Sequence, residues 1–310
     1  MNSILHKARL GAQPGGRPPA AVEVSPEGVL AAALPGPGQP PVYAFLPLAA
    51  GALAPGIGEP NLRATEAIVS AIRSALGQVS PRTHAVTLIL PDTVVRVFVL
   101  DFDSLPSKTA EANSVLRFRL RKMVPFEVEH AGLSYQVLME SKTECKVLAA
   151  VIPGPILAEY EAAVRAAGYE PGAVLPSGLA ALEVVNSIGT IEAMEAVLIA
   201  NLSSLALTTS ITNGQDLLLY RTLDLPEDPE QRLDEVRRGI AVAAAYYEDK
   251  LQLRPRQLYF AGAGGAYDFG RWIDDPELTV ADLAPQPEIG ATTTLPKSIA
   301  GVAGALAGVS

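Results

Sequence analysis

The single cysteine of the chain, Cys145, is the first side chain to examine for covalent chemistry. A nucleophilic thiol needs a neighbouring base, and the three histidines, His6, His84 and His130, occur in no spacing that would supply one. The surrounding stretch, 143–148, is typical of the start of a strand. We therefore expect an ordinary strand residue, and a lone cysteine also excludes an internal disulfide.

A second candidate is the glycine-rich stretch Gly262-Ala263-Gly264-Gly265, which directly follows the apolar residues 258–260. Glycine lets the backbone approach a ligand closely and adopt positive φ. The stretch therefore has two interpretations: a loop that contacts a ligand, or a tight turn between a strand and a helix. The short pattern alone does not separate them.

Charged residues gather at two places. Arg117, Arg119, Arg121 and Lys122 lie on a predicted helix, where Arg117 and Arg121 share one face because they are four residues apart. This cluster is either a solvated basic face or a docking face for an acidic partner or a neighbouring subunit. An acidic group surrounds the start of a later helix, where negative charge suits the helix dipole: Glu227, Asp228, Glu230, Asp234 and Glu235.

The composition limits the class of protein. The chain has 310 residues, 49% of them hydrophobic, which allows two domains with sizeable cores. Its net charge of −9 argues against a nucleic-acid partner, because binding to phosphates needs an excess of cations. No apolar run reaches the length of a membrane-spanning helix, and the N-terminus lacks the apolar centre of a signal peptide. We expect a cytoplasmic protein without direct membrane insertion.

Strands and helices that could position these groups alternate along the chain. Pro26-Glu27-Gly28 predicts a turn between two strands within 20–34, because proline fixes φ and glycine permits positive φ. Asn213-Gly214 predicts a hairpin between the strands 205–212 and 217–223. The other strands are predicted at 43–48, 85–90, 94–100, 135–139, 146–152, 196–200 and 258–260. Helices are predicted at 61–76, 108–123, 155–167, 176–187, 230–250 and 298–309. Groups of strands followed by helices occur twice, which indicates an internally duplicated α/β protein.

Three segments resemble the PilM-like type IV pilus assembly proteins of the actin-like ATPase superfamily. They are 115–129 (VLRFRLRKMVPFEVE) with the strand 135–138 (YQVL), then 160–171 (YEAAVRAAGYEP), and finally 237–247 with 258–265. The resemblance covers about residues 20–310. It implies an α/β, actin-like (ASKHA or FtsA-like) two-domain fold with a small inserted α/β subdomain of the SHS2-like type.

The resemblance also implies a division of the chain. Residues 1–19 would be a flexible N-terminus, 20–84 subdomain 1A, and 85–170 the inserted subdomain 1C. A helix returning to subdomain 1A would follow at 171–195. Domain 2 (2A/2B) would span 196–297, and 298–310 would form a C-terminal helix.

In this superfamily ATP lies between the two domains, where one turn from each holds the phosphates and a metal ion. The first turn here would be built from Glu23, Ser25, Pro26, Glu27 and Leu30. Glu23 keeps the expected acid, but Ser25 stands in place of glycine and Leu30 in place of the usual lysine. Pro26 removes an N–H donor, and Glu27 adds negative charge where a phosphate would lie. Each change weakens anion binding.

The second turn would be built from Ala200, Leu202, Ser203 and Ser204. Ala200 replaces the metal-binding acid and Leu202 replaces the glycine, although the two serines could still donate hydrogen bonds. The third loop is retained: Gly262, Gly264 and Gly265 would lie under the adenosine or would form only a tight turn. We expect a pseudo-ATPase with no catalytic residue, no metal site, and at most weak ATP binding as its cofactor chemistry.

The function implied by the resemblance is a cytoplasmic scaffold of a type IV pilus machine, peripheral to the inner membrane through its partners. Such proteins bind the cytosolic N-terminal peptide of a PilN-like inner-membrane protein in a groove between the first domain and the insertion. Here that groove would be lined by parts of 20–34 and 85–168, and other pilus subunits would be further partners. Two alternatives remain open: an active ATPase or sugar-type kinase, and a cytoplasmic scaffold of a type II secretion system.

Overall fold

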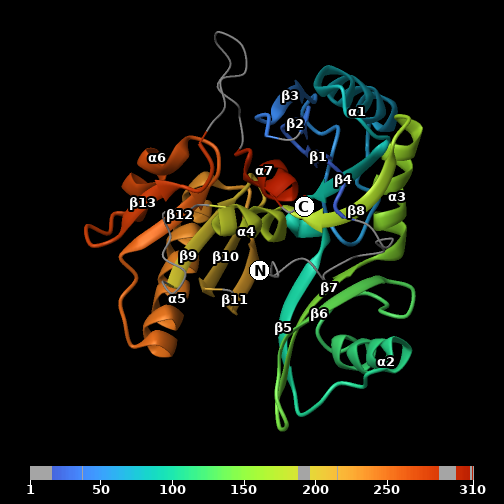
Figure 1. Ribbon diagram of the computed structural model, residues 1–310. Helices are drawn as coiled ribbons and strands as arrows, with labels where there is room; N and C mark the ends of the chain where they lie inside the picture. Colours follow the sequence, from blue (N-terminus) through green and yellow to red (C-terminus); the bar gives the residue numbers. More distant parts are fainter. Residues whose placement is uncertain are drawn as a thin grey trace.

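The computed structural model describes residues 16–36, 38–187, 196–214, 216–285, 298–307 and 309. Figure 1 shows two α/β halves side by side, with a smaller unit built from β5, β6, β7 and α2 extending from one of them. Parts of three predicted segments, residues 1–15, 188–195 and 286–297, lie outside the described residues.

The first half is built on a five-stranded sheet in the order β3-β2-β1-β4-β8. β1 is antiparallel to β2, β2 is antiparallel to β3, and β1 is parallel to β4, which is parallel to β8. The strand bounds are β1 Ala20–Ser25, β2 Gly28–Ala33, β3 Val42–Pro47, β4 Ala85–Leu90 and β8 Glu170–Pro176. Helix α1 (Thr65–Val79) packs on this sheet through Ile68, Ile72 and Leu76, whose spacing places them on one face.

The second half repeats the same sheet in the order β11-β10-β9-β12-β13. β9, β10 and β11 form an antiparallel meander, and β12 and β13 continue parallel to β9. The bounds are β9 Ala196–Leu202, β10 Ala206–Asn213, β11 Asp216–Asp224, β12 Gln257–Ala261 and β13 Thr279–Asp282, with helices α5 Pro229–Leu251 and α6 Gly265–Ile273. The predicted duplication is confirmed, because each sheet joins an antiparallel meander to two parallel strands.

Two helices lie between the halves: α4 (Ser177–Ser187) and α7 (Ala300–Ala307), of which α7 consists mainly of small residues (Figure 1). They share one apolar core with strands of both sheets, including Ile89 from the first and Ile199 from the second. A Cβ atom at Gly304 would lie 1.9 Å from the Ala180 carbonyl oxygen, so this close approach requires glycine. Helix α7 therefore packs closely against α4, as the small residues of 298–309 predicted.

The insertion is a three-stranded antiparallel sheet in the order β5-β7-β6 with α2 packed on one face. It begins after the 3₁₀ turn η1 (Asp92–Val94), and its elements are β5 Arg96–Phe102, α2 Thr109–Leu120, β6 Gly132–Glu140 and β7 Cys145–Ile152. Cys145 is fully buried among apolar side chains of this unit, and burial raises the pKa of its thiol. The prediction of an ordinary strand residue is confirmed.

Two elements expected in the insertion, β4 and α3 (Gly154–Ala166), belong instead to the first half. β4 lies between β1 and β8, and α3 packs against α1 and β8. β4 is buried on both faces, as is common in parallel sheets, so its pattern alone does not say which sheet it joins. β8 is not predicted as a strand because Pro171 and Gly172 interrupt it; Pro171 is tolerated because β8 is an edge strand.

The last residues of the expected flexible N-terminus are anchored. The Arg17 guanidinium lies 3.2 Å from a carboxylate oxygen of Glu183 on α4, and both side chains are largely buried. The Leu34 amide also donates to the Pro19 carbonyl. Residues 16–19 are thus held in place by contacts with α4 and with the first half.

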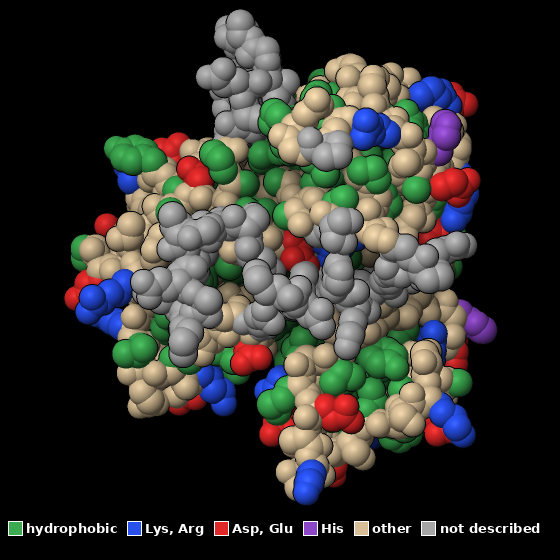
Figure 2. All heavy atoms as spheres, viewed as in Figure 1, with side chains coloured by type: hydrophobic (Ala, Val, Ile, Leu, Met, Phe, Trp, Pro, Cys, Tyr) green, Lys and Arg blue, Asp and Glu red, His purple; other side chains and the backbone are tan. Residues whose placement is uncertain are grey.

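The surface carries both signs of charge. Figure 2 shows Lys and Arg side chains interspersed with Asp and Glu around the rim of the visible face. Among the described residues, several surface ion pairs form, such as Arg238 with Glu235, and such pairs contribute little to stability individually. Within the described ranges, no helix has both the length and the apolar composition needed to cross a bilayer.

Candidate functional site

A cavity of about 490 Å³ lies where the two sheets meet. Its walls come from the β1–β2 turn, the end of β4, the start of α4, the β9–β10 turn, the start of α5, the loop before α6, the end of α6, and the segment leading into α7. Both hairpin turns reach the same cavity because the duplicated sheets face each other across α4 and α7. The structure therefore brings together five of the predicted residues, namely Glu23, Ser25, Glu27, Ser203 and Ser204.

The β1–β2 turn presents acids and few donors. The Glu23 side chain is buried, and its carboxylate accepts a hydrogen bond from the Ser177 hydroxyl at 3.0 Å. The Ser25 hydroxyl donates to the Gly28 carbonyl at 3.1 Å within the same turn. Pro26 has no N–H, and Glu27 lines the cavity beside it. This turn offers a ligand negative charge and apolar surface.

The β9–β10 turn is held by hydrogen bonds within the turn itself. The Ser203 hydroxyl accepts from the amides of Leu205 and Ala206, at 3.3 and 3.0 Å, and the Ser203 amide donates to the Ala206 carbonyl. Among the described residues, the buried Ser204 hydroxyl has no hydrogen-bond partner. Of the two serines predicted to meet phosphate, Ser203 is bonded within its own turn and the hydroxyl of Ser204 is buried.

Asp92, which the sequence analysis did not single out, lies at the base of the cavity and joins the two halves. Its carboxylate accepts hydrogen bonds from the Gly178 amide (2.8 Å), the Asn201 side-chain amide (3.0 Å) and the Thr208 hydroxyl (2.8 Å). Burial raises the pKa of Asp92, and these three hydrogen bonds oppose that shift. The nearby charge of Glu23 adds to the increase.

The sequence does carry a weak signal for Asp92. It follows an apolar strand directly, at the strand end where α/β proteins place functional groups. However, Pro91-Asp92-Thr93 is also an ordinary turn composition. Its partners Gly178, Asn201 and Thr208 lie 86, 109 and 116 residues away, so only the fold reveals the cluster.

The backbone conformation of the glycine-rich loop explains why it contains glycine. Gly264 and Gly265 have φ values of 80° and 79°, which favour glycine strongly. The Ala266 amide then donates to the Asp282 carboxylate at 2.9 Å. Of this stretch, Ala263 lines the cavity, while Gly262, Gly264 and Gly265 shape the turn behind it.

The side-chain donors that line the cavity are already used within the protein. Phosphate sites present several backbone or side-chain donors to the anion, but Ser25, Ser177 and Asn201 already donate within the protein. The guanidinium of Arg232, a cation of the lining, donates to the carbonyls of Pro226 and Glu227. In the part of the chain that the structure describes, no three His, Cys, Asp or Glu side chains converge as a metal site.

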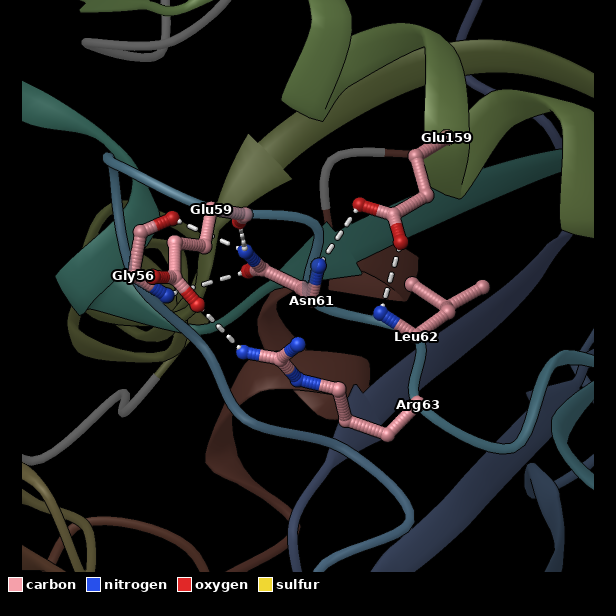
Figure 3. Close-up of polar contacts among 6 residues, drawn as sticks. All are labelled: Gly56, Glu59, Asn61, Leu62, Arg63 and Glu159. Atoms are coloured by element: carbon pink, nitrogen blue, oxygen red, sulfur yellow. Dashed lines mark hydrogen bonds and ion pairs between the residues drawn. The ribbon is translucent and has the colours of Figure 1, made fainter.

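A separate polar cluster orders the long loop before α1 (Figure 3). The Glu159 carboxylate of α3 accepts from the backbone amides of Asn61 and Leu62, at 2.9 and 2.6 Å. The Asn61 side chain bonds both the amide and the carbonyl of Gly56 at 3.0 Å and the Glu59 carbonyl at 2.7 Å. This pinned loop explains why α1 begins at Thr65 rather than near residue 61.

The duplicated sheets, the small insertion in the first half and the cavity between the halves define an actin-like fold. No protein-family model matches the sequence, and no curated protein matches it either. Solved structures do match. A chain of a PilM–PilN type IV pilus biogenesis complex is 17% identical, with a TM-score of 0.75, and the match covers 94% of this chain and 98% of that one.

Two further structures share the fold more distantly. The cytoplasmic domain of EpsL, an inner-membrane component of the type II secretion system of Vibrio cholerae, is 13% identical with a TM-score of 0.50, covering 93% of this chain and 92% of that one. A Bacteroides thetaiotaomicron protein with an actin-like ATPase fold and unknown function is 11% identical, also with a TM-score of 0.50, covering 86% and 91%. The predicted fold and its PilM-like architecture are confirmed.

Proposed function

We propose that this chain is a cytoplasmic scaffold of a type IV pilus assembly machine that binds the cytosolic peptide of a PilN-like inner-membrane protein. The observation that carries the proposal is the end-to-end structural match, insertion included, to a chain of a PilM–PilN complex. Through that peptide the scaffold would lie at the inner membrane and meet other pilus subunits.

Exposed apolar side chains support the insertion as part of the docking surface. The described residues include ten large hydrophobic side chains that are exposed, and half of them lie on α2, just after it, or on β6. These five are Val115, Phe118, Met123, Val137 and Met139. A peptide with apolar anchors would cover such side chains and gain from their burial.

A direct binding measurement tests this part of the proposal. A synthetic peptide with the cytosolic N-terminal sequence of the PilN-like partner is titrated into the intact chain, with a scrambled peptide as control. Phe118→Asp is expected to weaken binding about tenfold or more, whereas Tyr267→Asp, at an equally exposed apolar residue of α6, leaves it unchanged. Absence of binding by the folded chain refutes the scaffold proposal. Binding only to a type II secretion partner would instead indicate a scaffold of that secretion system.

The proposal includes a cleft that does not hydrolyse ATP. The internal use of its donors and the acids Glu23 and Glu27 support this part. Isothermal titration with Mg-ATP is expected to give no micromolar binding. Micromolar affinity, or turnover that Glu23→Ala abolishes, contradicts it.

One observation favours an active ATPase as a second candidate. Asp92 is a buried carboxylate with a raised pKa beside a cavity, which is a common property of catalytic bases. Its three internal hydrogen bonds favour a structural role instead. Measurable turnover that Asp92→Asn removes, with the fold intact, would support the second candidate.

A further inference from the structure

We infer that the cavity between the halves binds an uncharged or cationic, mainly apolar small molecule in the place where related folds hold a nucleotide. The inference rests on the proposed loss of nucleotide binding and names the chemistry that replaces it.

The walls of the cavity are largely apolar. Apolar side chains reach it from both turns and from two helices of the second half: Pro26, Leu202, Leu205, Leu233, Val236 and Trp272. The positions on α5 share one helix face because Leu233 and Val236 are three residues apart. Burying such surface against a ligand is favourable, so an apolar molecule would gain from contact with these side chains.

The charge of the lining disfavours anions. Three acids, Glu23, Glu27 and Asp92, face the cavity together with one arginine, Arg232. Arg232 is held at 3.1 Å from two loop carbonyls by its own guanidinium donors. The charged side chains of the lining therefore disfavour an anionic ligand relative to a neutral ring or an amine. The starts of α4 and α5 at the same cavity carry partial positive charge and offset part of this preference.

The cavity also has the size of a ligand site. Its volume of about 490 Å³ lies within the usual range for small-molecule pockets. Ser204 belongs to the lining, but its hydroxyl oxygen is buried. A ligand would therefore be held mainly by contact with the apolar side chains of the walls.

The chain carries its own reporter for this site. It contains a single tryptophan, and that residue, Trp272, lines the cavity. Energy transfer from tryptophan to a fluorescent probe therefore reports binding near this position. A suitable pair of probes is N-phenyl-1-naphthylamine and 8-anilino-1-naphthalenesulfonate, which share one aromatic skeleton and differ by a sulfonate.

We expect saturable energy transfer with the neutral naphthylamine and affinity at least about tenfold weaker for the sulfonate. Leu233→Gln and Leu205→Gln each remove the signal, whereas Leu253→Gln, at a residue exposed away from the cavity, retains it. Glu27→Gln reduces the difference in affinity between the two probes, because it removes one negative charge from the lining. Far-ultraviolet circular dichroism of each variant verifies the fold.

The outcomes separate this inference from the proposed function. If neither the naphthylamine nor Mg-ATP binds, the apolar site is refuted while the proposed loss of nucleotide binding stands. If Mg-ATP displaces the naphthylamine at micromolar concentration, both the apolar-ligand site and the proposed loss of nucleotide binding are refuted. Equal affinity for the two probes, or a signal that both cavity variants retain, also overturns the inference.

Discussion

Replacing Asp92 with alanine removes the acceptor that ties the two halves together at the base of the cleft. The Gly178 amide and the Asn201 side-chain amide would then be buried without their acceptor, whereas the Thr208 hydroxyl keeps its contact with Thr222 at 2.9 Å. Each buried donor left unsatisfied costs about 1–3 kcal/mol. Relief from burying a carboxylate offsets part of this, so we expect Asp92→Ala to lower the free energy of unfolding by about 2–4 kcal/mol.

The pH dependence gives a second, independent readout of Asp92. Because burial raises its pKa, the native state holds the Asp92 proton to higher pH than the unfolded state does. The stabilisation that comes from this tighter proton binding is therefore fully present below about pH 4, where unfolded aspartate titrates. It is lost as pH rises through the pKa of Asp92 in the native state. Asp92→Asn does not titrate, so the stability of the wild type minus that of this variant should fall with rising pH across that window.

The assay is urea-induced unfolding followed by circular dichroism, repeated from mildly acidic to neutral pH. Asp101→Ala is the matched control, because Asp101 is a mostly exposed aspartate paired with Lys146 at the surface; its effect should stay within about 0.5 kcal/mol. A loss of stability in Asp92→Ala no larger than that in Asp101→Ala would refute the role of Asp92 as a buried acceptor. A stability difference between the wild type and Asp92→Asn that stays flat or increases with pH would refute the raised pKa of Asp92.

Three further predictions concern the packing that supports the site. Glu159→Gln should leave one loop amide without its acceptor, cost about 1–3 kcal/mol, and speed hydrogen exchange at Asn61 or Leu62. Gly304→Ala should lower the melting temperature, because the new Cβ would overlap the Ala180 carbonyl and overpacking costs about 1–3 kcal/mol. Cys145, buried and with a raised thiol pKa, should not react with Ellman's reagent until the protein unfolds.

Each of these has a control within the chain. Glu161→Gln, on the exposed side of the same helix, should leave the loop amides unchanged. Gly77→Ala meets nothing within 4 Å and should raise the melting temperature slightly, because alanine favours a helix. Rapid reaction of Cys145 in the native protein would contradict its burial, and a Gly304→Ala variant as stable as Gly77→Ala would contradict the close approach of α4 and α7.

Local sequence signals are sufficient to predict the turns, strands and first helix of this fold. The Pro26-Glu27-Gly28 and Asn213-Gly214 turns, the apolar strands and the α1 periodicity are short-range signals, and the structure confirms them. The duplication and the two altered turns were also recognisable, because each turn is a continuous run of residues. The small residues of 298–309 predicted close helix packing for the same reason.

Which of these elements pair and pack together depends on long-range contacts that local sequence signals do not contain. β4 joins β1 rather than the insertion, and β8 completes that sheet despite Pro171, because pairing with a neighbouring strand outweighs local propensity. The Asp92 cluster depends on partners about a hundred residues away. The same holds for the apolar cavity, since its walls come from both halves and no single segment of sequence contains the surface that a ligand would touch.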